Sequence, residues 1–192
     1  MIGFVIIQRD KVPGRVYRDP VDGRCRIQYT PSSDDLSNNL EGMLAAAKIA
    51  KVMGAKEIFS YHPDAPRYER PEKGPGEAKT DEGVNEPAFQ TWLSEIQRLG
   101  LKSPDPCTLG SAHQMGTCRM GSDPRRGVVD ARGRVFGTQG LYVADASVFP
   151  SASGVNPMVT NMGIADWISR GIADELKSPD GRPESVTLSA KL

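Results

Sequence analysis

Residues 141–160, LYVADASVFPSASGVNPMVT, contain the pattern on which the fold prediction for this chain depends. The run of residues 141–144 is typical of a short buried strand. After an intervening loop, Asn156-Pro157 is typical of a helix start, with Asn as the N-cap and Pro as the first helical residue, and the helix is expected to end near Leu176. Free N–H groups at a helix start can stabilise an anion or a developing anionic oxygen.

A second segment with chemical potential precedes this one. Residues 111–121 read SAHQMGTCRMG, and they place His113, one of two histidines in the chain, among glycines and small polar residues. The chain around this segment is glycine-rich and irregular up to about Gly140, and long ordered irregular segments are commonly functional. Because a neutral imidazole is a competent base near pH 7, His113 is a candidate general base.

The rest of the chain predicts a mixed α+β fold. Apolar or alternating runs at 2–8, 14–18 and 25–30, separated by turn dipeptides, favour an antiparallel meander. Ser33 or Asp34 is expected to cap a helix that Gly54 ends; its helically spaced apolar residues are Leu36, Leu40, Met43, Leu44, Ala47, Ala50 and Val52. A strand at 55–61, a mobile loop or lid at 62–86, a helix at 87–100 and an unstructured tail from 177 follow.

Composition excludes several classes of function. The 192 residues are 38% hydrophobic and 25% charged, and 24 basic side chains balance 24 acidic ones. Without a basic excess, neither nucleic acid nor an anionic membrane is expected as a partner. Three irregularly spaced cysteines do not form a disulfide framework, and the apolar run at the N-terminus is too short for a membrane span. The oligomeric state does not follow from the sequence.

Together these motifs resemble a known family. The segment around His113, the spacer motifs GVVD at 127–130, GRVFG at 133–137 and GLYVAD at 140–145, and GVNPM at 154–158 occur in the order of the C-terminal signature of the glucose-methanol-choline (GMC) oxidoreductases. The residues of the first and last motifs are most similar to those of the long-chain fatty alcohol oxidase branch. The resemblance is dense over residues 111–176 and looser over 3–54.

The resemblance implies roles for individual residues. A histidine at the position of His113 takes the proton of the substrate hydroxyl while hydride leaves for the N5 atom of FAD, and Asn156 hydrogen-bonds the alcohol oxygen. The flavin is expected to contact Pro157 and Met158 at the start of the last helix. A further contact, to the ribityl chain of the flavin, is implied for Asp145 and Ala146 at the end of the preceding strand.

Simpler interpretations of the same residues remain open. Without its neighbours, Asn156 would be only a helix cap and Asp145 only a turn former at a strand end. The spacing of Cys107, His113 and Cys118 is compatible with zinc, but a fourth ligand and closely paired cysteines are missing, so no metal is expected. His62 lies in no motif.

The resemblance also implies a domain layout. Residues 1–110 are expected to be part of a substrate domain of antiparallel sheet and helices, 111–140 the catalytic histidine loop and connection, 141–176 the last strand and helix of the FAD domain, and 177–192 a flexible tail. The dinucleotide-binding fingerprint Gly-x-Gly-x-x-Gly is missing, because Lys79 follows Gly74-Pro75-Gly76 where the last glycine would stand. The chain is therefore expected to be a fragment that lacks the N-terminal FAD-binding segment.

The expected function is that of the C-terminal part of an FAD-dependent alcohol oxidase. Its substrates would be a primary, long-chain alcohol and O2, and the alternative is an inactive remnant that serves as a binding module. The final residues Ala190-Lys191-Leu192 resemble the Ser-Lys-Leu address that the peroxisomal import receptor binds. Peroxisomal targeting is therefore expected, with the cytoplasm as the other location.

Overall fold

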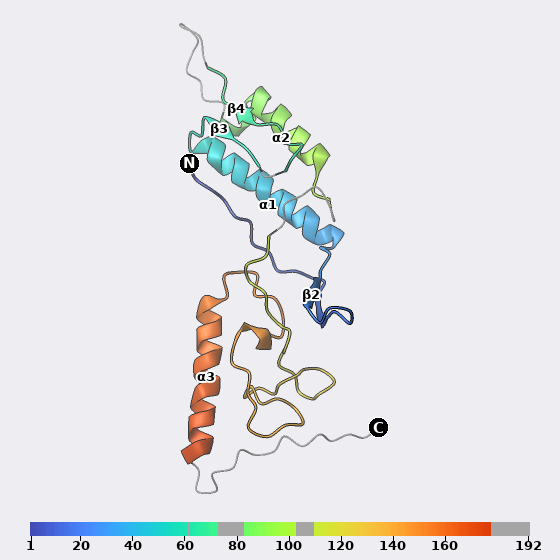
Figure 1. The fold of residues 1–192 in the computed structure, drawn as a ribbon. Coiled ribbons are helices and arrows are strands. Elements are labelled where there is room, and N and C mark those ends of the chain that lie inside the picture. The colour runs from blue at the N-terminus through green and yellow to red at the C-terminus, as the bar shows by residue number, and fades with distance from the viewer. Residues whose placement is uncertain (61, 73–82, 103–109, 178–192) are drawn as a thin grey trace. The chain divides into compact units, whose positions relative to one another are not determined.

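The computed structural model describes residues 1–60, 62–72, 83–102 and 110–177, and it divides the chain into two compact units (Figure 1). The first unit consists of Met1–Gly14 and Gln28–Gly110, and the second of Arg15–Ile27 and Ser111–Leu192. Helices and small sheets both occur, so the α+β prediction is confirmed, although neither sheet has more than two strands in the described part of the chain.

Helix α1 of the first unit, Ser33–Val52, begins at a capping box. The hydroxyl of Ser32 accepts a hydrogen bond from the backbone N–H of Asp35 at 3.1 Å, and the Asp35 carboxylate accepts one from the backbone N–H of Ser32 at 3.1 Å. The cap is thus Ser32, one residue before the predicted position. Gly54 ends the helix with a φ of 88°, a conformation that favours glycine.

The core of the first unit lies between α1, α2 and the short strand β4. Helix α2, Pro87–Leu99, confirms the predicted helix, and strand β4, Tyr68–Glu69, pairs antiparallel with β3, Glu57–Ile58. The ring of Phe89 stacks on Trp92 at a centroid distance of 5.8 Å and meets Tyr68 edge-on at 5.1 Å. The buried apolar core residues are Ala47, Tyr68, Phe89, Trp92, Leu93 and Ile96.

The buried face of α1 differs from the predicted one at its C-terminal end. Val52 was expected to face the core, but its side chain is exposed and that of Lys51 is buried. The reason is the helical period, because Leu40, Leu44, Ala47 and Lys51 share one face. The Lys51 ammonium donates hydrogen bonds to the Tyr68 hydroxyl at 2.6 Å and to the Glu86 carboxylate.

The prediction of a strand at residues 2–8 is wrong. No strand forms before residue 15, and the Ile6 side chain instead lies against Gly42 of α1, where an added Cβ would come within 2.6 Å of it. An isolated apolar run needs a neighbouring strand for its backbone hydrogen bonds, and here the run packs on a helix. The predicted lid at 62–86 contains β4 and a 3-10 turn at Gly83–Asn85, and its residues 73–82 lie outside the described part.

The second unit contains a hairpin and long loops that pack beside one helix. Strands β1, Arg15–Arg18, and β2, Cys25–Gln28, form the two-stranded sheet that remains of the predicted meander. The irregular segment expected up to Gly140 is confirmed. The predicted strand at 141–144 is reduced to an isolated bridge between Arg134 and Tyr142, because the neighbouring segments are turns that offer only short runs of backbone partners.

Helix α3, Met158–Lys177, confirms the predicted last helix, but it starts later than expected. The carbonyl oxygen of Pro157 accepts the first helical hydrogen bond, from the N–H of Asn161 at 2.8 Å, so Pro157 and not Asn156 occupies the cap position. The described helices include none that is long and apolar enough to cross a membrane. The expected tail at 177–192 is wrong at Lys177, because Lys177 is the last residue of α3. Residues 178–192, with Ala190-Lys191-Leu192, lie outside the described residues.

Candidate functional site

The two predicted motif segments lie side by side in the second unit. Backbone N–H groups of the histidine segment donate to carbonyl groups of the 3-10 turn η2, Ala146–Val148: Gly116 to Ala146 at 3.2 Å, Cys118 to Ser147 at 2.8 Å and Met120 to Val148 at 2.9 Å. These three hydrogen bonds, donated by every second residue of the histidine segment, fix the register of the two segments, although the segments are about thirty residues apart in the sequence. The structure therefore unites the segment that carries His113 with the segment that carries Asp145 and Ala146.

Glycine is required where these segments touch. Gly116 has a φ of 83°, and a Cβ there would lie 3.2 Å from the Phe149 carbonyl oxygen. Farther along, Gly121 and Gly127 cross so closely that a Cβ on Gly121 would lie 2.5 Å from the Gly127 nitrogen. Beneath these crossings, the buried side chains of Val129, Val148 and Phe149 form the small core of this unit.

Asp145 caps the η2 turn. Its Oδ1 accepts a hydrogen bond from the Ser147 backbone N–H at 2.8 Å. A hydrogen bond from the Ser147 side chain is the largest cause that lowers the pKa of Asp145, followed by the backbone bond, while slight burial opposes both. The carboxylate is exposed and ionised. The alternative interpretation of Asp145 as a turn former is therefore confirmed, and it does not exclude a second contact.

His113 and Asn156 stand on different segments of the same unit. The His113 side chain is half-buried in the loop before the Gly116 turn, and Asn156 is exposed in the loop before α3. No hydrogen bond joins the two side chains in the described part of the chain. Asn156 does not cap α3 with its side chain, so the alternative interpretation of Asn156 as a helix cap does not hold.

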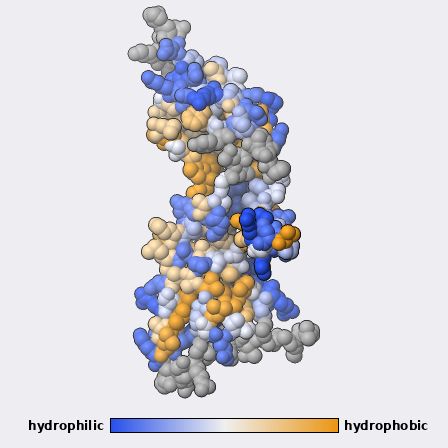
Figure 2. All heavy atoms as spheres, in the orientation of Figure 1, coloured by the Kyte–Doolittle hydropathy of each residue, from blue (hydrophilic) through white to orange (hydrophobic). Residues whose placement is uncertain are grey.

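The first turn of α3 offers backbone donors at the surface. Because Asn161 is the first residue that bonds back to Pro157, the N–H groups of Met158, Val159 and Thr160 have no acceptor within the helix. The side chains of Val155, Met158, Val159 and Met162 around them are exposed, and Figure 2 shows apolar atoms along α3. A polar donor set thus adjoins an apolar surface.

Comparison with known proteins decides the family. The sequence model described as GMC oxidoreductase matches residues 11–165, which is most of the chain. The chain belongs to the GMC oxidoreductase family. The family relationship predicted from the motifs is confirmed.

Relatives of this GMC oxidoreductase chain include several alcohol oxidases. Two long-chain-alcohol oxidases of Arabidopsis thaliana are each 33% identical to it, FAO4B over 79% of the chain and 19% of its own length, and FAO3 over 90% and 21%. A cholesterol oxidase of Acinetobacter baumannii is 46% identical over 29% of the chain and 10% of its own length. The chain spans about a fifth of the length of the long-chain-alcohol oxidases that it matches.

The residues of this GMC chain fit the edge of a flavin. GMC oxidoreductases generally depend on FAD, whose ring system has flat apolar faces and a polar pyrimidine edge that becomes negative on reduction. The free N–H groups of Met158, Val159 and Thr160 suit the polar edge, and the exposed apolar side chains around them suit the ring faces. No group of three or more side chains that could hold a metal ion occurs in the described residues, and Cys107 lies outside them.

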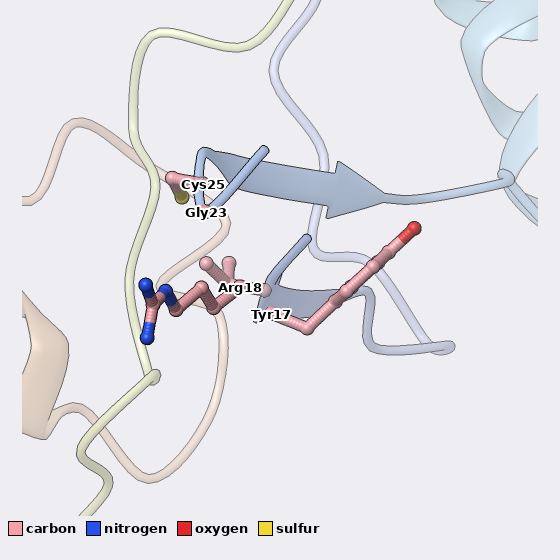
Figure 3. Close-up of a pocket in the computed structure, with 5 residues that line it drawn as sticks. Tyr17, Arg18, Gly23 and Cys25 are labelled. Atoms are coloured by element: carbon pink, nitrogen blue, oxygen red, sulfur yellow. The ribbon is translucent and has the colours of Figure 1, made fainter. Parts of the chain in front are cut away.

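An open pocket elsewhere in the second unit contains none of the predicted site residues. It has a volume of about 350 Å³ and is lined by Val16, Tyr17, Arg18, Gly23 and Cys25 of the β1–β2 hairpin. In Figure 3 the Arg18 and Tyr17 side chains extend to opposite sides, as expected for neighbours in a strand. The pocket therefore adds no ligand to the site predicted from the motifs.

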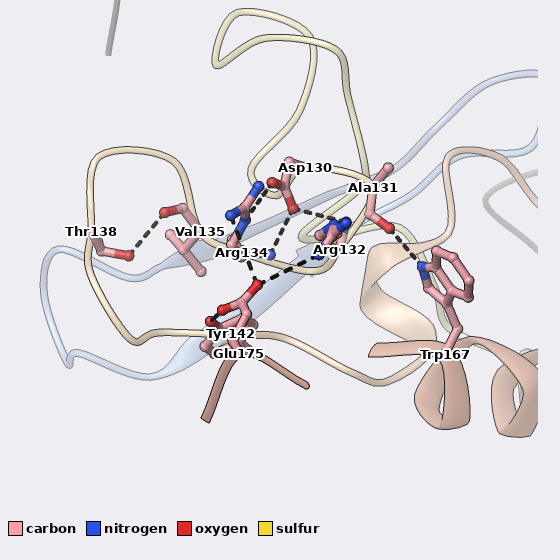
Figure 4. A network of polar contacts seen from close by, with 9 residues as sticks. All are labelled: Asp130, Ala131, Arg132, Arg134, Val135, Thr138, Tyr142, Trp167 and Glu175. Carbon is pink, nitrogen blue, oxygen red and sulfur yellow. Dashed lines mark hydrogen bonds and ion pairs between the residues drawn. The ribbon is translucent and has the colours of Figure 1, made fainter. Parts of the chain in front are cut away.

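A polar network between the loop and α3 was not predicted from the sequence. Glu175 of α3 pairs with Arg132 and Arg134 of the loop and accepts a hydrogen bond from Tyr142, as Figure 4 shows. Asp130 pairs in turn with Arg134. Burial favours the neutral Asp130 carboxyl, but hydrogen bonds from Arg134 and from backbone N–H groups outweigh it and lower the pKa of Asp130. The spacing of Asp130 and Arg134 was a signal for their pairing, whereas nothing in the sequence links Tyr142 with Glu175.

Proposed function

We propose that this chain forms the catalytic C-terminal part of an FAD-dependent oxidase that converts a primary long-chain alcohol into the aldehyde, with O2 as the final electron acceptor. The observation that carries the proposal is the hydrogen-bonded pairing of the His113 segment with the η2 turn. Two motifs that are far apart in the sequence form one surface through it. Membership in the GMC family and similarity to long-chain-alcohol oxidases support the reaction class.

The proposed roles follow from the chemistry of the side chains. The His113 imidazole takes the proton of the substrate hydroxyl, and the Asn156 amide holds the alcohol oxygen without competing for its proton. FAD, when bound, supplies the acceptor for the hydride that leaves the same carbon. The half-buried position of His113 restricts the water around the imidazole and still leaves an approach for substrate.

The start of α3 is proposed to hold the flavin. Its free N–H groups at Met158, Val159 and Thr160 stabilise negative charge on the pyrimidine edge, and the helix dipole adds to this effect. Pro157 has no N–H of its own and instead fixes the backbone that leads into the helix. Asp145 and Ala146 are proposed to contact the ribityl chain, with Ser147 holding the Asp145 carboxylate in place.

Substitution of His113 tests the proposed base. In a longer, FAD-loaded protein that also carries the FAD-binding segment, His113→Ala is expected to slow anaerobic flavin reduction by a long-chain alcohol by at least about 10²-fold, the lower range for loss of a general base. Stopped-flow absorbance of the flavin measures this rate. His62→Ala, at the other histidine of the chain, is the control and should reduce at the wild-type rate. An unchanged rate in His113→Ala would reject the assignment.

Asn156→Ala separates substrate positioning from flavin binding. The Asn156 side chain caps no helix, so its loss should slow flavin reduction while the flavin content stays normal. Flavin absorbance per protein and the reduction rate report the two effects. A normal rate with normal flavin content would remove Asn156 from the reaction.

A catalytically inactive binding module is the alternative function, and the exposed apolar side chains at the start of α3 are compatible with it. Flavin absorbance distinguishes the two functions. A longer protein that carries an FAD-binding segment, binds no FAD under any condition and yet retains a partner through this surface would favour the module.

A further inference from the structure

The placement of α3 in the second unit depends on contacts near the middle of the helix and near its C-terminal end. The Ile168 side chain is buried against Gly133, where a Cβ would lie 2.7 Å from the Ile168 Cδ1 and 2.7 Å from the Val143 carbonyl oxygen. The Trp167 indole N–H donates to the Ala131 carbonyl oxygen at 3.2 Å. About two turns later, Glu175 meets the polar network of the loop.

Glu175 has partners from two segments of the loop. Its carboxylate accepts a hydrogen bond from the Tyr142 hydroxyl and lies 3.8 Å from the Arg134 guanidinium and 3.9 Å from that of Arg132. Arg134 is in turn held by Asp130 at 2.8 Å. The side chains of Glu175, Asp130 and Arg134 are only 15 to 18% exposed, so solvent screens these contacts less than surface ion pairs.

The first turns of α3 contrast with the rest of the helix. Met158, Val159 and Met162 are exposed, and in the described part of the chain the side-chain polar contacts between α3 and the loops occur at Trp167 and Glu175.

A helix transmits a displacement along its axis because its backbone is stiff, and Glu175 lies about 26 Å along the axis from Met158 at about 1.5 Å per residue. Ile164 packs on the buried core of the unit and Ile168 on Gly133, so they hold the middle of the helix. The contacts of Glu175 add a second point of attachment, which fixes the direction of the helix axis and with it the place of the first turn.

We propose that Glu175, held by Tyr142 and Arg134, is a positioning residue that sets the place of the α3 N-terminus, and with it the backbone donors proposed to face the flavin. The part of this inference that concerns the flavin rests on the proposed function, whereas the part that concerns the place of the helix does not. Glu175 touches neither substrate nor cofactor and acts through the helix alone.

Hydrogen exchange of the 192-residue chain tests the geometry without any cofactor. Glu175→Ala is expected to accelerate amide exchange of residues 163–168 and 172–177 by about tenfold or more, comparable to the loss of one hydrogen bond to a charged group. Glu175→Gln, which keeps an oxygen for the Tyr142 hydroxyl, should restore part of the protection. Exchange at Met120 and Val129, whose backbones pair in the loop core, should stay unchanged.

Asp166→Asn is the matched control, because Asp166 forms an ion pair with Arg170 on the solvent face of the same helix, with the two side chains 61% and 77% exposed. It should leave exchange in α3 within about twofold of the wild type. Equal acceleration throughout the second unit in Glu175→Ala would show a general loss of stability. Unchanged exchange would show that Glu175 does not hold α3 in place. Either result would overturn the proposal.

The flavin provides the second readout. In FAD-loaded protein, Glu175→Ala is expected to release flavin at least about tenfold faster, while Asp166→Asn releases it at the wild-type rate. Wild-type release in Glu175→Ala would overturn the positioning role. A longer protein that carries an FAD-binding segment and still never binds FAD would refute the proposed function instead, and the exchange experiment would still decide whether Glu175 holds the helix in place.

Discussion

Lys51 and Glu86 form an ion pair whose two partners differ in burial. The Lys51 side chain is 1% exposed and that of Glu86 is 22% exposed, and both bond to the Tyr68 hydroxyl. Burial lowers the pKa of Lys51, but the hydrogen bonds to Glu86 and Tyr68 outweigh it, so the pKa is raised and the ammonium stays charged. The site stabilises the first unit only while both charges are present.

Removal of either partner should therefore have unequal effects. Glu86→Gln leaves a buried ammonium without its counter-charge and is expected to cost about 3 kcal/mol, whereas Lys51→Met leaves a carboxylate that water can reach and should cost about 1 kcal/mol. Chemical denaturation of the two variants measures both values. Arg67→Gln, in the exposed pair with Glu57, is the control and should cost less than about 1 kcal/mol. Equal losses for the two partners would contradict this assignment.

Asp145 makes a local contribution that can be separated from its proposed contact with the flavin. Asp145→Ala removes the acceptor for the Ser147 N–H and is expected to destabilise the second unit by about 1 kcal/mol, while Asp145→Asn keeps an acceptor and should cost less. Thermal unfolding of the chain without FAD measures this cap. A silent Asp145→Ala would show that the η2 turn does not depend on its cap.

Single residues could be predicted where several motifs supported one another. His113, Asp145 and Asn156 each lie in a motif whose neighbours occur in the expected order, and the pairing of the first two segments agrees with that pattern. Lys51 was missed because a charged residue is normally placed on the solvent side of a helix. Only the spacing from Leu40, Leu44 and Ala47 showed that it shares their buried face.

Helices were easier to predict than strands at the level of elements. The periodicity of α1, α2 and α3 is local, and their ends carry cap or glycine signals. A strand depends on a partner elsewhere in the chain, so the apolar runs at 2–8 and 141–144 could not reveal that no partner strand was present. The start of α3 was misplaced by one residue because Pro is common both at the cap and just after it.

The capping box of α1 predicts a dependence of stability on pH. A hydrogen bond with the Ser32 side chain is the largest cause that lowers the pKa of Asp35 below its ordinary value of 3.8, and burial opposes it. Because the folded-state pKa lies below the unfolded one, this stabilisation is complete above pH 3.8 and is lost as the pH falls through the folded-state pKa. Acid should therefore weaken the first unit.

Asp35→Asn tests this dependence. The variant is expected to be less stable than the wild type at neutral pH, and the difference should shrink as the pH falls below about 4. Denaturant titrations at a series of pH values measure it. Asp34→Asn, at the exposed neighbour that pairs with Lys11, should show little change. A difference that stays constant in acid would show that the Asp35 carboxylate does not titrate as inferred.

At the scale of the whole molecule, the exposed face of α3 predicts self-association. Met158, Val159 and Met162 together with Val155 present apolar side chains to solvent at helical spacing. The chain alone should form oligomers at micromolar concentration, and Val159→Thr with Met162→Gln should reduce them. Trp167 of the same helix is exposed as well, whereas Ile168 is buried against Gly133. A monodisperse monomer with a cooperative melt would contradict this prediction.

The division into two units also limits what the sequence could predict. The boundary between Gly110 and Ser111 coincides with the start of the histidine motif, whereas the assignment of the Arg15–Ile27 hairpin to the second unit has no signal in the sequence. Such long-range contacts depend on tertiary packing, and the predicted domain layout stays a prediction.

The most direct test of the proposed function is anaerobic titration of the FAD-loaded protein with a long-chain primary alcohol. The alcohol is expected to bleach the flavin absorbance, one aldehyde should form for each flavin reduced, and admission of O2 should restore the oxidised spectrum. A flavin that binds at the expected stoichiometry but remains oxidised in the presence of alcohols of every chain length would contradict the assignment of this chain to an alcohol oxidase.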